Sequence, residues 1–319
     1  MPIFHLHQAF IRQTIGLGGE QEKVEADANQ FSGKRYVSRI TLTAGKFSVA
    51  DIFDDNRYAH DPRKGFLNWS IWASGAFDYA ADQFGFTWGA VAELNQKSWA
   101  LRAGYFLVPR MSNVNTFDLE VGRRGSYVAE LETRYVIGAQ PGKVRLLAWL
   151  NEAFSGSYRD ALADPTIDLA PSRRTRSKYG FGVNVEQALS DDLGFFSRLS
   201  WNDGKSEIMS FTDIDASASG GLVWKGRMWG RPEDSIGLAG AVNGLSSAHR
   251  AFLAAGGLGI LVDDGQLNYR PERILETYYT YVIDKYWTLT ADYQFIVNPA
   301  YNADRGPVSI FGARVHAEF

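Results

Sequence analysis

The stretch WTLTADYQFIVN, residues 287–298, alternates apolar and polar side chains. Its odd-numbered positions are apolar, and Thr288, Thr290, Asp292 and Gln294 lie between them. A period of two is typical of a strand with one apolar and one polar face. In a soluble sandwich the apolar face would be the core, whereas in an outer-membrane barrel it faces lipid and the polar face lines a lumen. The fold therefore depends on which face meets water.

The same alternation recurs along the chain, at 86–95, 99–107, 127–137, 179–187 and 308–319. We count about fourteen such segments, most of them close to the roughly 9–11 residues that a tilted strand needs to cross a bilayer. The weakest is 4–16, where Arg12 fits neither face. The pattern predicts an all-β fold, an antiparallel transmembrane outer-membrane β-barrel with about fourteen readable strands.

Composition restricts the class of protein. The 319 residues carry a formal net charge of -3 and include 9 Trp, 15 Tyr, 20 Phe and 32 Gly, as expected for many strands and tight turns. No run of about 18 apolar residues is present, which excludes a transmembrane helix, and the charge gives no case for nucleic acid. The absence of cysteine excludes disulfides and thiolate sites. The start, MPIFHLHQAF, lacks the features of a signal peptide, which an exported protein is expected to carry.

The connections between segments also point to a barrel. From residue 98 onward, short links at 139–142, 190–193 and 284–286 alternate with long ones at 109–125, 157–177, 206–213 and 246–269. Outer-membrane barrels sort short turns and long loops in this way. The pattern fails upstream, where 80–83 and 96–97 both look short and 50–65 is long. Either a strand is miscounted there or the 50–65 segment folds back on the barrel.

Aromatic residues indicate that the apolar face meets lipid. They gather at the ends of the apolar stripes, as interfacial girdles require, at Trp99, Tyr127, Tyr135, Tyr179, Trp201 and Trp287. The chain ends on Phe319 after an amphipathic strand, which predicts recognition by the barrel-assembly machinery.

Four long segments then resemble one family. LTAGKFSVADIFDDNRYAHDPRKGFLNW (42–69), GAFDYAADQFGFTWGAVAELNQKSWALRAGYF (75–106), WNDGKSEIMSFTDIDASASGG (201–221) and NPAYNADRGPVSIFGARVHAEF (298–319) are similar, in this order, to the carbohydrate-selective porin family OprB. The resemblance runs from about residue 35 to the end of the chain. It implies an outer-membrane barrel of about sixteen strands that passes monosaccharides by diffusion. Family members carry a signal peptide and further early strands, so residues 1–319 are expected to be a single porin domain that is N-terminally incomplete.

If the apolar face meets lipid, the charged residues of opposite parity line the pore. The predicted pore-lining residues are Arg39, Glu93, Arg102, Glu130, Glu132, Arg134, Lys178, Glu186, Arg198, Glu276, Asp292 and Arg314. Mixed charges offer sugar hydroxyls a hydrogen-bonding lattice, although most such charges in a porin pair with one another. The inward aromatics Trp72 and Tyr278 are expected either to stack on a pyranose ring or to pack against a plug or loop.

The loop DIFDDNRYAHDPRKG, residues 51–65, is predicted to narrow the pore. Its constriction candidates are Asp51, Asp54, Asp55, Arg57 and Asp61. These carboxylates could instead bind Ca²⁺, but their spacing is not that of an EF-hand and we predict no metal site. The stretch SSAHRAFLAAGG, residues 246–257, predicts a short helix with Ser at its N-cap in a long external loop.

No catalytic constellation is apparent. GLGG (16–19) and GGLG (256–259) lack the context of a phosphate loop, and His5 with His7 has no third ligand at zinc spacing. We therefore predict a carbohydrate porin of the bacterial outer membrane that has no cofactor and no enzymatic activity, and that is a monomer or a homotrimer. The alternatives are a general diffusion porin, and an exported soluble sandwich or propeller that binds glycans.

Overall fold

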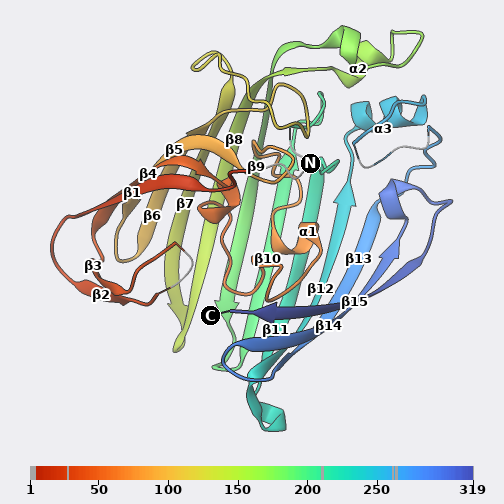
Figure 1. The fold of residues 1–319 in the computed structure, drawn as a ribbon. Helices are drawn as coiled ribbons and strands as arrows, with labels where there is room; N and C mark the ends of the chain where they lie inside the picture. Colours follow the sequence, from red (N-terminus) through yellow and green to blue (C-terminus); the bar gives the residue numbers. More distant parts are fainter. Residues whose placement is uncertain (1–4, 27–28, 210–211, 261, 263–264, 319) are drawn as a thin grey trace.

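The computed structural model describes residues 5–26, 29–209, 212–260, 262 and 265–318. Thirteen strands form one antiparallel sheet in chain order, which curls around a central space (Figure 1). They are β1 (Ala9–Gly16), β4 (Arg39–Phe47), β5 (Thr87–Asn95), β6 (Trp99–Phe106), β7 (Gly125–Ile137), β8 (Gln140–Ser155), β9 (Arg174–Ala188), β10 (Leu193–Asn202), β11 (Ala216–Gly226), β12 (Arg231–Gly244), β13 (Glu272–Val282), β14 (Trp287–Val297) and β15 (Val308–Ala317). β2 (Gln21–Val24) and β3 (Gly33–Tyr36) form a separate hairpin between β1 and β4.

Helical structure is confined to short pieces. The helices are α1 (Trp69–Trp72), α2 (Tyr158–Ala161) and α3 (Ser247–Ala254), with 3₁₀ turns η1 (Val49–Asp51), η2 (Ala170–Ser172), η3 (Arg227–Trp229) and η4 (Pro299–Tyr301). Within the described ranges, no helix is both long enough and apolar enough to cross a membrane. The predicted helix at 246–257 is confirmed as α3, and the Ser246 side chain accepts a hydrogen bond from the His249 backbone N–H.

The apolar face of the sheet points outward. On β14, Trp287, Leu289 and Ala291 are exposed, whereas Thr290 and Asp292 are buried. One row of paired outward residues crosses β6 to β12, and its members are Leu101, Leu131, Leu146, Val183, Leu199, Ala218 and Val242. A soluble sandwich would bury such a row as its core. The exposed apolar belt matches the lipid-facing surface of an outer-membrane barrel, as predicted.

From β4 onward, short and long connections alternate between the two ends of the sheet, whereas the β1–β4 connection at the short-turn end is long and carries the β2–β3 hairpin. Short turns at 96–98, 138–139, 189–192, 227–230 and 283–286 share one end, and long loops at 48–86, 107–124, 156–173, 203–215, 245–271 and 298–307 share the other. The interpretation of 80–83 as a turn between strands is wrong, because residues 48–86 form a single connection between β4 and β5. Ala80 and Ala81 look turn-like in sequence but are buried in a hydrophobic cluster.

Residues 48–86, here called the inserted segment, fold into the space that the sheet encloses (Figure 1). Phe53 and Phe77 of this segment pack with Trp149 on the inner face of the sheet. Farther along the segment, Phe66 packs with Tyr278, with the two rings 4.9 Å apart and 79° from parallel. Tyr278 therefore follows the second of its two predicted roles, which is packing rather than stacking on a sugar.

The two edge strands β1 and β15 each have one neighbour in the described sheet. All twelve pairings between neighbours are antiparallel, so β1 and β15 run in the same direction. Among the described residues, thirteen strands form this sheet and two more form the hairpin, compared with the prediction of about fourteen. The predicted assembly signal at Phe319 lies outside the described residues.

Candidate functional site

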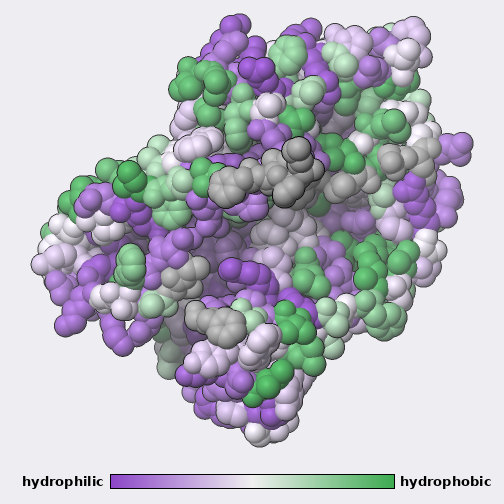
Figure 2. All heavy atoms as spheres, viewed as in Figure 1, coloured by the Kyte–Doolittle hydropathy of each residue, from purple (hydrophilic) through white to green (hydrophobic). Residues whose placement is uncertain are grey.

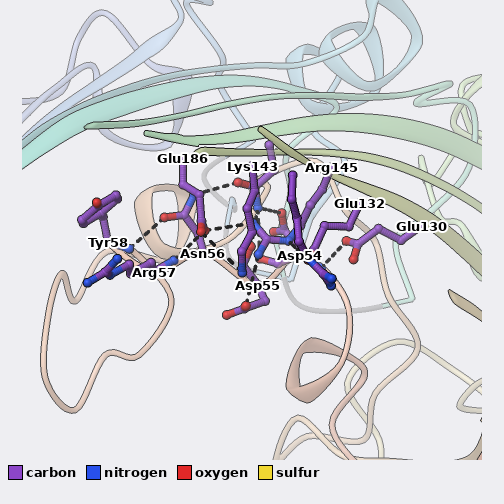
Figure 3. A network of polar contacts seen from close by, with 12 residues as sticks. Asp54, Asp55, Asn56, Arg57, Tyr58, Glu130, Glu132, Lys143, Arg145 and Glu186 are labelled. Atoms are coloured by element: carbon purple, nitrogen blue, oxygen red, sulfur yellow. Dashed lines mark hydrogen bonds and ion pairs between the residues drawn. The ribbon is translucent and has the colours of Figure 1, made fainter. Parts of the chain in front are cut away.

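The inserted segment is held by carboxylates on the inner face of the sheet. Glu130 accepts a hydrogen bond from the Asp54 backbone N–H at 2.7 Å. Glu186 accepts one from the Arg57 backbone N–H at 2.8 Å (Figure 3). Glu276 on β13 accepts the backbone N–H groups of Leu67 and Asn68. These wall carboxylates therefore bind loop backbone that has no strand partner of its own.

Basic wall residues bind the same segment. The Arg198 guanidinium lies 3.2 Å from an Asp54 carboxylate oxygen and donates to the carbonyl of Ile71 at 3.0 Å. Arg314 on β15 donates to the carbonyls of Pro62 and Gly65. Because these contacts run along most of the insertion, its path inside the sheet is fixed by side chains predicted to line the pore.

The twelve predicted pore-lining residues all face the inside, but they separate into two groups. Six bind the inserted segment, namely Glu130, Lys178, Glu186, Arg198, Glu276 and Arg314. Five line an open cavity, namely Arg39, Glu93, Arg102, Glu132 and Arg134. The remaining one, Asp292, is buried and accepts a hydrogen bond from Gln294 at 3.2 Å. Contact between any of them and a solute stays a prediction.

The cavity-lining charges form a continuous ion-pair lattice. The Arg102 guanidinium lies 2.6 Å from both Glu93 and Glu130 and 3.4 Å from Glu132. Glu132 also forms an ion pair with Arg134, at 2.7 Å. Each carboxylate of the lattice has a cationic partner, which offsets part of the cost of keeping these groups largely out of bulk water.

Arg145 on β8 is the member of this lattice that the sequence analysis did not single out. Its side chain is 0% exposed and lies 2.9 Å from Glu132, 3.0 Å from Glu186 and 3.3 Å from Asp55. Figure 3 shows Arg145 between the strand carboxylates and the inserted segment. The parity of β8 could have revealed Arg145, because its neighbour Leu146 belongs to the outward apolar row.

Two cavities that share several lining residues lie beside the inserted segment. The first, here called the charged cavity, has a volume of about 910 Å³ and is lined by the lattice, by Lys143 and by residues 29–35 of the β2–β3 hairpin. The second, here called the aromatic cavity, has a volume of about 1230 Å³ and is lined by Trp69, Trp72 and Tyr79. In Figure 2, hydrophilic residues surround the hollow at the centre of the view.

The two cavities share two acidic lining residues. Asp51, Asp55 and Arg12 line the charged cavity and the aromatic cavity alike, so they mark the place where the two meet. The Asp55 side chain is 53% exposed there. Two of the five constriction candidates therefore stand at the junction of the cavities.

The other three constriction candidates lie elsewhere. Asp54 is buried and bound by Arg198, Asn184 and Ser74. Arg57 is exposed, and Asp61 lines the aromatic cavity, where it pairs with Arg63 at 2.9 Å. Over the part of the chain that the structure describes, no group of three His, Asp or Glu side chains is placed to hold a metal ion.

Comparison with known proteins agrees with this architecture. The family model described as "Carbohydrate-selective porin, OprB family" matches residues 1–319. The structure of OprB from Pseudomonas putida is similar with a TM-score of 0.65 and 16% identity, over 88% of this chain and 70% of that one. The outer-membrane channel DcaP of Acinetobacter baumannii is similar with a TM-score of 0.50 and 12% identity, over 93% and 80% of the two chains. No curated protein sequence matches. At these identities the structural likeness concerns the fold.

Proposed function

The chain belongs to the OprB family of carbohydrate-selective porins, and we propose that sugars cross it through the aromatic cavity and the charged cavity, passing Asp51 and Asp55 where the two meet. It is an outer-membrane channel for small carbohydrates, and its family and fold are those of a channel rather than an enzyme. The observation that carries the proposed route is the pair of cavities that share these two carboxylates.

The charge lattice suits diffusion of a polyhydroxylated solute. Sugar hydroxyls both donate and accept hydrogen bonds, so alternating guanidinium and carboxylate groups can replace their water in any orientation. The lattice charges are already paired, as Arg102 is with Glu93, so each contact with a sugar is weak. Weak binding at several sites is what conduction requires, because a tight site would stop the flow.

The route is tested by a double substitution, Asp51→Asn with Asp55→Asn. In channels purified from the outer membrane and placed in planar bilayers, wild type should show conductance steps that glucose partly blocks. The variant should bind glucose about two- to tenfold more weakly, because neutral hydrogen bonds are weaker than charged ones. It should also shift ion selectivity toward anions. Asp191→Asn is a matched control, since Asp191 is exposed in a short turn.

The outcomes separate the possible functions. Wild-type steps that are insensitive to glucose would assign the protein to general diffusion. Unchanged glucose block in the double variant would mean that Asp51 and Asp55 do not contact the sugar as it crosses the channel.

We also propose that the thirteen strands belong to one barrel domain that closes through additional strands between β15 and β1. Lipid does not tolerate unpaired strand edges, since their N–H and C=O groups find no water there. β1 and β15 run in the same direction, so an all-antiparallel closure needs an odd number of further strands between them. The 319-residue chain refolded alone should therefore give no stable conductance steps, unlike channels purified from the outer membrane. Equal steps from both would point instead to direct parallel pairing of β1 and β15.

A further inference from the structure

We propose that Trp72 is a stacking platform for a hexopyranose ring in the aromatic cavity. This binding subsite rests on the proposed sugar route. It specifies the class of ligand, which is a ring-closed sugar, and the protein surface that contacts it, which is the face of the Trp72 indole. Trp72 ends α1, is half-buried, and lines the aromatic cavity together with Trp69. An aromatic side chain on the wall of a sugar route can contact the apolar C–H face of a sugar while polar groups bind its hydroxyls.

The helix that carries Trp72 is held rigidly. Asn68 caps α1 by accepting the Ser70 N–H, while its own backbone N–H donates to Glu276 and its side chain donates to Gln294. Ile71 is fully buried beneath the helix against the inner face of the sheet. A platform fixed in this way loses little conformational freedom when a ligand stacks on it.

The ring contacts of the two tryptophans differ. Trp69 is stacked with Tyr79, at 5.8 Å between ring centroids and 16° between planes. Trp72 contacts Trp69 at 62° and His60 at 80°, both far from parallel. Among the described residues, no aromatic ring lies parallel to the Trp72 indole. Among these residues, a sugar ring in the cavity therefore has no parallel aromatic ring to displace from the Trp72 indole.

Charged groups that line the same cavity as Trp72 suit the hydroxyl-bearing edge of a sugar. Asp61 and Arg63 line the same cavity and form a two-pronged pair, with Nε and Nη2 of Arg63 each 2.9 Å from an Asp61 oxygen. Asp51 lines it as well. A pyranose carries apolar C–H groups on its faces and hydroxyls around its edge, so an aromatic face beside paired charges complements both surfaces.

The experiment compares a ring-closed sugar with an open-chain polyol of similar size and hydroxyl content. Block of single-channel current is titrated with glucose and with sorbitol in wild type, Trp72→Ala, Trp72→Phe and the control Trp229→Ala. Trp229 is exposed at the short-turn end and lies in neither cavity. In Trp72→Ala, the dissociation constant for glucose should rise about two- to tenfold, the range expected for one aromatic contact, while that for sorbitol stays the same. Trp72→Phe should keep most of the preference for glucose.

A purely structural Trp72 predicts a different result. If the indole only packs the inserted segment, Trp72→Ala should change glucose and sorbitol block equally, or change neither, and that outcome would overturn the subsite. Should Trp72→Ala fail to insert, Trp72→Phe and Trp72→Leu provide the comparison, because only Phe retains an aromatic face. Failure of the sugar route itself would show as a wild-type channel that glucose does not block.

Discussion

Replacing Arg198 with methionine should lower the free energy of unfolding by roughly 3–5 kcal/mol and raise the open-channel conductance. The Arg198 side chain is 1% exposed and pairs with Asp54, which is itself 3% exposed. The same guanidinium donates to the carbonyls of Ile71, Asp54 and Ala59. Without it, a buried carboxylate loses its cation and the inserted segment loses four of its hydrogen bonds to β10.

Urea unfolding in detergent, followed by tryptophan fluorescence, measures the first effect, and current amplitude and noise in planar bilayers measure the second. Arg227→Met is a matched control, because that side chain is 64% exposed and its ion pair with Asp192 should be worth at most about 1 kcal/mol. The double variant Asp54→Asn with Arg198→Met should recover part of the lost stability, since it removes both buried charges. An unchanged unfolding midpoint in Arg198→Met would mean that this pair does not secure the inserted segment.

The sheet could be predicted from the sequence because lipid constrains every outward position. A single charged residue there is costly, so the outward face of β14 stays apolar at Trp287, Leu289 and Ala291 while the inward face is free to vary. The same rule placed all twelve charged candidates on the inner face. It could not separate those that bind the inserted segment from those that line a cavity, because both kinds share one parity.

The fold-back of residues 50–65 was one of the two alternatives that the sequence offered, but the path of the inserted segment could not be predicted because its structure is not periodic. Its backbone N–H groups donate hydrogen bonds to side chains that are distant in the sequence. The Asp54 N–H donates to Glu130, 76 residues later, and the Leu67 N–H donates to Glu276, 209 residues later. No local pattern records such pairings. For the same reason, residues 80–83 were interpreted as a short link between strands, and the β2–β3 hairpin was not predicted.

Changing Leu131 to arginine should destabilise the protein in a lipid bilayer by roughly 2–4 kcal/mol. Leu131 is the middle residue of β7, is 37% exposed, and pairs with Leu101 and Leu146 in the outward apolar row. A charge in the middle of a bilayer-facing strand loses its hydration without gaining a partner. The change in the free energy of unfolding is measured by titrating the protein in phospholipid vesicles with denaturant. The folded fraction at each concentration is the fraction that shows heat-modifiable migration on a gel.

Ile137→Arg turns this measurement into a test of depth. Ile137 is 63% exposed and is the last residue of β7, on the same face as Leu131, so arginine there can reach the lipid headgroups and should cost only about 0–1 kcal/mol. A water-facing surface predicts no such difference, because exposed substitutions in water stay within about 0.5 kcal/mol wherever they lie along a strand. Equal effects at the two positions would contradict the lipid-facing assignment. A large cost at Leu131 alone would place the centre of the membrane near the middle of β7. The ion-pair lattice would then lie at the same depth, because Glu130 and Glu132 flank Leu131 in sequence and face inward.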